Sequence, residues 1–153
     1  MTPTPKPVKV TLAEDVNKTN TGQTTGMIRQ SAIVDMYPPP APQHPPKLTP
    51  LPPTPAPNIC GTLMRAQAHS GSAVHHHGSQ DTIVYAVSGH GAIVSEGGRK
   101  RQDLKPGDWA LIPAFAEHQE VNDGDEEAVW VICRGPGGIP VVENLEGWGE
   151  SPK

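Results

Sequence analysis

Three histidines in this chain are spaced so that their imidazoles could meet on one metal ion. His75 and His77 are separated by a single residue, and His118 follows about forty residues later. Because side chains along a β-strand alternate between its two faces, His75 and His77 point to the same side, roughly 6–7 Å apart at Cα. Three neutral nitrogen ligands hold a divalent ion and leave positions open for water, dioxygen or substrate. The spacing therefore predicts a three-histidine metal centre.

The segments that must position these histidines have the pattern of short β-strands. From Ile59 onward, alternating apolar segments are separated by turn sequences such as Ser88–Gly91 and Asn122–Asp125, at the spacing of sandwiches and barrels. Proline and glycine are abundant and strong helix-forming runs are missing, so we expect an all-β fold. The predicted strands are Ile59–Ala68, Ala73–His77, Thr82–Val87, Gly91–Ser95, Arg99–Asp103, Asp108–Ile112, Glu117–Val121, Ala128–Arg134 and Ile139–Val142.

The first 58 residues differ in composition from the rest of the chain. Val8–Leu12 and Met27–Tyr37 alternate apolar and polar residues and are predicted to form short strands. Eleven of the 19 prolines fall between Pro38 and Pro57, which is typical of an extended polyproline segment. Such a segment is either a stiff connector along the barrel or a ligand for a proline-binding domain. The predicted units are an N-terminal arm with this Pro-rich strap (1–58), a β-barrel (59–142) and a C-terminal tail (143–153).

Two motifs around the histidines resemble those of the cupin superfamily. The second cupin motif, G-x5-P-x-G-x2-H-x3-N, is matched with every spacing kept, except that Phe115 replaces its middle glycine; the matching residues are Gly107, Pro113, His118 and Asn122. The first motif, G-x5-H-x-H-x3-4-E-x6-G, is matched by His75, His77 and Gly89, with Gly71 two residues closer to the histidines than the pattern has it. The resemblance implies a double-stranded β-helix, a jelly-roll-like barrel, preceded here by the Pro-rich arm.

The glutamate of the first cupin motif has no counterpart in this chain. Counted from the neighbouring motif residues, its position falls on Asp81 or Thr82, and Gln80 lies beside both. The resemblance therefore implies three histidine ligands, supplemented by Gln80, by Asp81 or by water alone. Glu120 is expected on the same strand face as His118, where it would replace the lost carboxylate as a catalytic base. The alternative for Glu120 is a solvated surface side chain.

The resemblance also indicates a class of reaction. Three-histidine iron cupins include dioxygenases acting on thiols and β-diketones, which implies an Fe(II) oxidoreductase for a small enolisable, phenolic or thiol substrate. Two alternatives stay open: a redox-neutral lyase, decarboxylase, isomerase or cyclase with Zn²⁺, Ni²⁺ or Mn²⁺, and a non-catalytic cupin that binds a small ligand. Arg65 would orient an anionic substrate if its strand face lines the cavity, and is an ordinary solvated side chain if it does not.

Charge and composition restrict the partners. The net charge of -4 gives no electrostatic case for binding nucleic acid or an anionic membrane. No segment approaches membrane-spanning length and Met1–Val10 lacks the apolar core of a signal peptide, so we expect a cytoplasmic protein. Cys60 and Cys133 show no metal or redox spacing and are expected to be reduced thiols, with a disulfide as the alternative. An arm with strands is suited to pairing with a neighbouring barrel, which predicts a homodimer.

Overall fold

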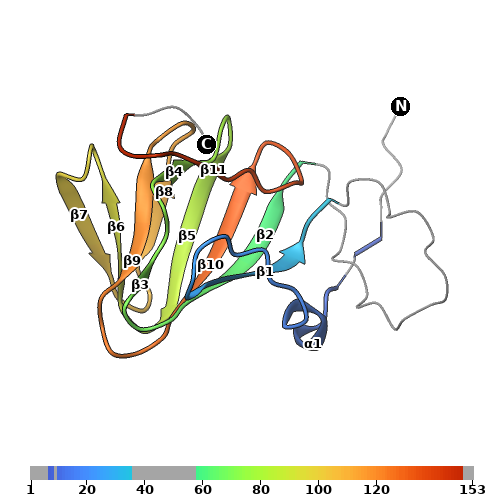
Figure 1. The fold of residues 1–153 in the computed structure, drawn as a ribbon. Helices are drawn as coiled ribbons and strands as arrows, with labels where there is room; N and C mark the ends of the chain where they lie inside the picture. The colour runs from blue at the N-terminus through green and yellow to red at the C-terminus, as the bar shows by residue number, and fades with distance from the viewer. Residues whose placement is uncertain (1–6, 9, 36–57, 150–153) are drawn as a thin grey trace, which may run out of the picture.

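The structure is a computed structural model that describes residues 7–8, 10–35 and 58–149. Within these ranges the chain forms two antiparallel sheets and one short helix (Figure 1), which confirms the predicted all-β double-stranded β-helix. The elements are α1 (Ala13–Val16), β1 (Met27–Ile33), β2 (Cys60–Ala66), β3 (Ser70–Gly71), β4 (His75–His76), β5 (Asp81–Ser88), β6 (Gly91–Ser95), β7 (Lys100–Leu104), β8 (Trp109–Ile112), β9 (His118–Asn122), β10 (Ala128–Gly135) and β11 (Glu143–Asn144).

Each sheet is assembled from strands that are distant in the sequence. One sheet has the order β1-β2-β10-β5-β8, and β5, β10, β2 and β1 can be followed side by side in Figure 1. The other has the order β11-β4-β9-β6-β7, with β3 also paired to β9. The inner faces of both sheets enclose the apolar core because alternate residues along each strand point inward. This closure brings β4 and β9, the two strands that carry the histidines, into direct contact.

Trp130 is the largest fully buried side chain of this core. It packs with Met64, Val84 and Ile132 from its own sheet. On the facing sheet, a Cβ atom on Gly91 would lie 2.7 Å from the Trp130 ring, closer than any side chain could be accommodated there. Glycine at the start of β6 therefore lets the two sheets approach over the indole.

Strand β1 is an edge strand of the first sheet and pairs with β2 of the same chain. It pairs antiparallel with β2, with Met27 opposite Ala66 and Ser31 opposite Thr62. The outer edge of β1 is also bonded by the preceding segment: the Ser31 amide donates to the Thr19 hydroxyl at 2.7 Å, and the Thr21 amide donates to the Arg29 carbonyl at 2.7 Å. The sheet edge is thereby covered from within the chain. The predicted homodimer stays a prediction.

Three expectations from the sequence need correction or lie outside the description. The described residues of Val8–Leu12 form no strand, and α1 follows them instead. The strand predicted over Ile139–Val142 is replaced by β11 just after it, which pairs with β4. The Pro-rich strap falls on residues 36–57, outside the described part of the chain.

Cys60 and Cys133 are free thiols. Among the described residues, no helix has the length and apolar character needed to cross a membrane.

Deleting residues 1–37 is expected to destabilise the barrel. The deletion removes β1, including the buried Met27, and exposes the edge of β2. The free energy of unfolding should fall by more than about 2 kcal/mol, the usual minimum for losing one buried methionine. Urea denaturation measures this loss, and sedimentation velocity tests whether the deletion also changes the oligomeric state. A variant lacking only residues 1–6 keeps β1 and is the control; equal stability of both variants would contradict the role given to β1.

Candidate metal centre

The three predicted histidines come together inside the barrel. His75 on β4 lies directly opposite His118 on β9, and His77 follows β4. All three are at most 1% exposed. Their ring centroids are 4.3 to 5.0 Å apart. His76, between the first two, faces the other way: its Nδ1 accepts from the Gly78 amide. Strand alternation thus separates His76 from the three histidines of the cluster.

Backbone carbonyls fix the orientation of each clustered ring. Nδ1 of His75 lies 2.9 Å from the Ala73 carbonyl, and Nδ1 of His118 lies 2.9 Å from the Ala116 carbonyl. Nδ1 of His77 lies 2.8 Å from the Val141 carbonyl. A carbonyl oxygen only accepts, so each Nδ1 carries the proton and each Nε2 presents a lone pair.

The three Nε2 atoms have no hydrogen-bond partner among the described residues, although all are buried. Buried polar atoms without partners are rare in folded proteins. Three converging imidazole lone pairs are the donor set that a divalent transition metal prefers. The residues present therefore fit a metal ion.

Glu120 is the fourth member of this cluster. It lies on β9 two residues after His118, and its side chain is buried. Its Oε1 is 3.5 Å from His75 Nε2 and 3.7 Å from His118 Nε2. The candidate ligand atoms of all four residues lie within 4.8 Å of one another. The carboxylate missing from the first motif is thus supplied by the strand of the second motif.

Arg29 of β1 holds the Glu120 carboxylate in place. Its Nη2 donates to Oε2 at 3.0 Å, and both side chains are buried. Burial by itself raises the pKa of the Glu120 carboxyl, but the charge of the Arg29 guanidinium beside it acts in the opposite direction, and that pKa lies well below its usual range. Glu120 is therefore ionised, and one of its two oxygens remains directed at the histidines.

His77 has no tendency to carry a positive charge. Burial is the main cause that lowers its pKa to about 2, and the nearby Arg134 guanidinium lowers it further. A neutral imidazole is the form that binds metal, so protons do not compete for this position near neutral pH.

Gln80 and Asp81 are not brought to the cluster, which corrects the expectation that one of them supplements the histidines. The Gln80 amide donates to the Pro136 and Ile139 carbonyls and accepts from the Val141 amide. It thereby holds the loop whose Val141 carbonyl orients His77. Asp81 is exposed, and its carboxylate accepts from the Ala114 amide. The first motif region therefore contributes no ligand beyond His75 and His77.

Arg65 lies on the outer face of β2, so its proposed contact with substrate is also corrected. Its guanidinium forms a half-exposed ion pair with Glu127 at 2.9 Å.

Phe115, which replaces the motif glycine, adopts a φ of 60°, the left-handed conformation that glycine adopts most readily. Its ring is exposed and lies against His76, with centroids 5.9 Å apart.

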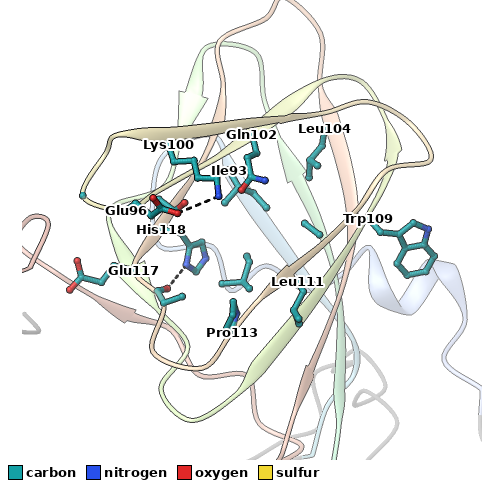
Figure 2. A pocket seen from close by; sticks show the side chains of 15 residues that line it. Ile93, Glu96, Lys100, Gln102, Leu104, Trp109, Leu111, Pro113, Glu117 and His118 are labelled. Carbon is teal, nitrogen blue, oxygen red and sulfur yellow. Dashed lines mark hydrogen bonds and ion pairs between the residues drawn. The ribbon is translucent and has the colours of Figure 1, made fainter.

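A cavity of about 660 Å³ opens at His118. Figure 2 shows it between β6 and β7 on one side and β8 on the other, with Trp109 directed away from it. The residues lining it include apolar Ile93, Leu104 and Ile112 and polar Gln102, while Lys100 and Glu96 form an ion pair at 3.3 Å. The site thus combines a buried cluster of ligands with space for a small molecule.

Two arginines at the centre of the barrel, Arg29 and Arg134, were not identified from the sequence. Both are buried on inner faces of the first sheet. Arg29 falls among the polar residues of an alternating segment, which is the pattern of an outward-facing position. Arg134 ends an apolar strand and carries no motif. Only the pairing of β1, β2 and β10 shows that both point inward.

Loss of any one clustered histidine is expected to reduce metal binding. Replacing His75, His77 or His118 by glutamine removes one lone pair from the converging set. Metal affinity should fall at least about tenfold, the lower bound seen even for residues that only support a ligand. Metal content is measured by mass spectrometry on untagged protein purified without chelators. His76→Gln, in the same triplet but on the other face, is the control; equal losses in all four variants would contradict this assignment.

The buried pair between Arg29 and Glu120 is expected to show strong coupling in a double-mutant cycle. Either Arg29→Met or Glu120→Gln leaves a buried charge unpaired, which costs about 3–5 kcal/mol, whereas the double variant should regain most of the loss. Urea denaturation of metal-free protein measures each value. The matching cycle at the exposed Arg65–Glu127 pair should show coupling of only about 0–1 kcal/mol. Similar coupling in both cycles would contradict the importance of burial.

Comparisons with known proteins agree with this architecture. Residues 62–133 match the family model of the cupin domain. A stretch of 56 residues is 36% identical to gentisate 1,2 dioxygenase 1 of Aquipseudomonas alcaligenes and covers 37% of this chain but only 16% of that protein. This chain therefore matches much less than two thirds of that relative's length.

Two solved structures share the fold over most of their length. KdgF from Halomonas sp. aligns with a TM-score of 0.61 at 15% identity, over 85% of this chain and 94% of its own. A Cupin 2 conserved barrel domain protein from Salinispora arenicola CNS-205 aligns with a TM-score of 0.58 at 20% identity, over 85% and 90%. The match over residues 62–133 makes this part of the chain similar to the cupin domain, and the two solved structures share its two-sheet fold.

Proposed function

We propose that this protein is a metal-dependent oxidoreductase, a non-haem Fe(II) dioxygenase for a small enolisable, phenolic or thiol substrate. The proposal rests on three buried Nε2 atoms that have no hydrogen-bond partner in the described part of the chain and that lie beside a cavity of about 660 Å³. The 56-residue similarity to a gentisate 1,2 dioxygenase supports dioxygenase chemistry over the alternatives.

Iron in this site would supply the redox chemistry that allows dioxygen to react with a bound organic molecule. A dioxygenase transfers both oxygen atoms to its substrate, so the reaction needs no separate reductant. The histidines would hold the ion through Nε2, with each ring oriented by the carbonyl on its Nδ1. This arrangement leaves ligand positions free for reactants.

Glu120 would serve as a ligand oxygen rather than as the catalytic base. A carboxylate whose pKa lies well below its usual range binds protons weakly and is a poor general base near neutral pH. Arg29 neutralises its charge and occupies Oε2, leaving Oε1 toward His75 and His118. This role differs from the base expected from the sequence.

The cavity at His118 would hold the substrate. Its apolar walls, formed in part by Ile93, Leu104 and Ile112, would exclude water from the organic part of the substrate. Gln102 and Lys100 lie on β7 at the same cavity and offer polar contacts at its wall. A volume of about 660 Å³ is sufficient for a molecule with one or two rings.

The proposal is tested by oxygen uptake of Fe(II)-loaded protein. Gentisate is the first substrate to assay, followed by a β-diketone and a small thiol. We expect one dioxygen consumed per product formed, loss of activity in His118→Gln and retention in His76→Gln. Product formation under strict anaerobiosis with Zn²⁺, Ni²⁺ or Mn²⁺ would instead establish the redox-neutral alternative. Metal binding with no turnover of any substrate would favour a ligand-binding cupin.

A further inference from the structure

Arg134 carries a buried guanidinium group. It lies on β10 with 2% exposure, and its Nε and Nη2 atoms have no hydrogen-bond partner within the described ranges. These two nitrogens lie on the same edge of the guanidinium and present two parallel N–H groups. Such an edge matches the two oxygens of a carboxylate. An unpaired buried charge is costly, so this edge is expected to meet a ligand.

Thr82 adds a second unpartnered donor beside it. Thr82 lies directly opposite Arg134 in the β5–β10 pairing, it is fully buried, and its hydroxyl has no partner in the described part of the chain. On its other side Thr82 pairs with Ile112 of β8, which lines the cavity at His118. Facing side chains on neighbouring strands are about 5 Å apart. The row from Ile112 through Thr82 to Arg134 therefore leads from the cavity wall to the guanidinium.

Among the described residues, the charges around this row leave one positive charge uncompensated. Glu120 is already paired with Arg29. Cys60, opposite Arg134 in the β2–β10 pairing, does not compensate it, because burial raises the pKa of the thiol and keeps it neutral. Burial is also the main cause that lowers the pKa of Arg134 to about 10, so the guanidinium stays charged at neutral pH. A metal ion would increase the positive charge further, and an anionic ligand would balance it.

We propose that Arg134 and Thr82 form a carboxylate subsite beside the metal centre, so that the substrate is a small carboxylic acid. The Nε and Nη2 hydrogens would bind the two carboxylate oxygens, and the Thr82 hydroxyl would donate a third hydrogen bond. The rest of the molecule would extend along Ile112 into the cavity at His118. This inference rests on the proposed function for its reaction and adds the chemical class of the substrate.

Benzoate is a suitable probe, with benzamide as its uncharged counterpart. In metal-free protein the side-chain Nε–H resonance of Arg134, assigned by its absence in Arg134→Lys, is followed by nitrogen–proton correlation spectroscopy. Benzoate should shift this resonance and benzamide should not. A resonance that moves with neither compound, or equally with both, would overturn the subsite. This readout uses the wild-type protein and does not depend on a variant folding.

Variants then measure the contribution of each donor. Arg134→Gln should weaken benzoate binding by at least about tenfold in calorimetric titration, since a charge-assisted bidentate contact is lost. Thr82→Val keeps the shape of the side chain and should weaken binding to a smaller, measurable extent. Arg65→Gln, an arginine change on the outer face, is the control. Equal benzoate affinity in Arg134→Gln and wild type would overturn the inference; if Arg134→Gln does not fold, Thr82→Val and the resonance shift decide it.

Metal content and oxygen uptake separate this inference from the proposed function. Bound metal with oxygen uptake, but no Arg134-dependent benzoate binding, would reject the carboxylate subsite and leave the dioxygenase proposal intact. Arg134-dependent benzoate binding in a protein that takes up no oxygen would support the subsite and reject the dioxygenase. Normal metal content in Arg134→Gln together with weakened benzoate binding would show that the arginine acts on the organic ligand rather than through the metal.

Discussion

The ion pair between Arg29 and Glu120 is the interaction on which the centre of this barrel depends. A carboxylate can remain ionised among apolar walls only if a counter-charge and hydrogen bonds replace the water it has lost. Arg29 provides both from β1, at 3.0 Å. The same contact fixes which carboxylate oxygen faces His75 and His118. Strand β1, at the edge of the first sheet, thus also supplies the positive charge that balances Glu120 in the candidate metal centre.

Much of this arrangement was predictable because it follows from local patterns. Alternation along a strand put His75 and His77 on one face and His76 on the other, and the structure shows the same separation. The glycine and proline spacing around His118 indicated the barrel, and the registers between β4 and β9 place His75 opposite His118. Phe115 shows that the turn before β9 keeps the left-handed backbone of the motif glycine even with a large side chain.

The remainder depended on contacts that no local pattern contains. Alternation groups residues on one face but does not say which face points inward. For this reason Arg65 was predicted as a possible substrate contact, although it lies on the outer face. Arg29, the third residue of β1, was not predicted to lie inside the barrel, although it does. The role of Gln80 was equally hidden, since its carbonyl partners come from a loop more than fifty residues away. Both cases are settled by long-range pairing rather than by residue type.

The position of β1 makes the working unit of this protein larger than the segment that matches the cupin domain model. The family match begins at residue 62, so it contains all four residues of the cluster but not Arg29. A barrel trimmed to those limits would keep the four clustered residues but would lose Arg29, so the buried Glu120 carboxylate would have no counter-ion. The two histidine motifs alone therefore do not make up the candidate metal centre, because the counter-charge of Glu120 comes from Arg29 on β1, outside the matched segment.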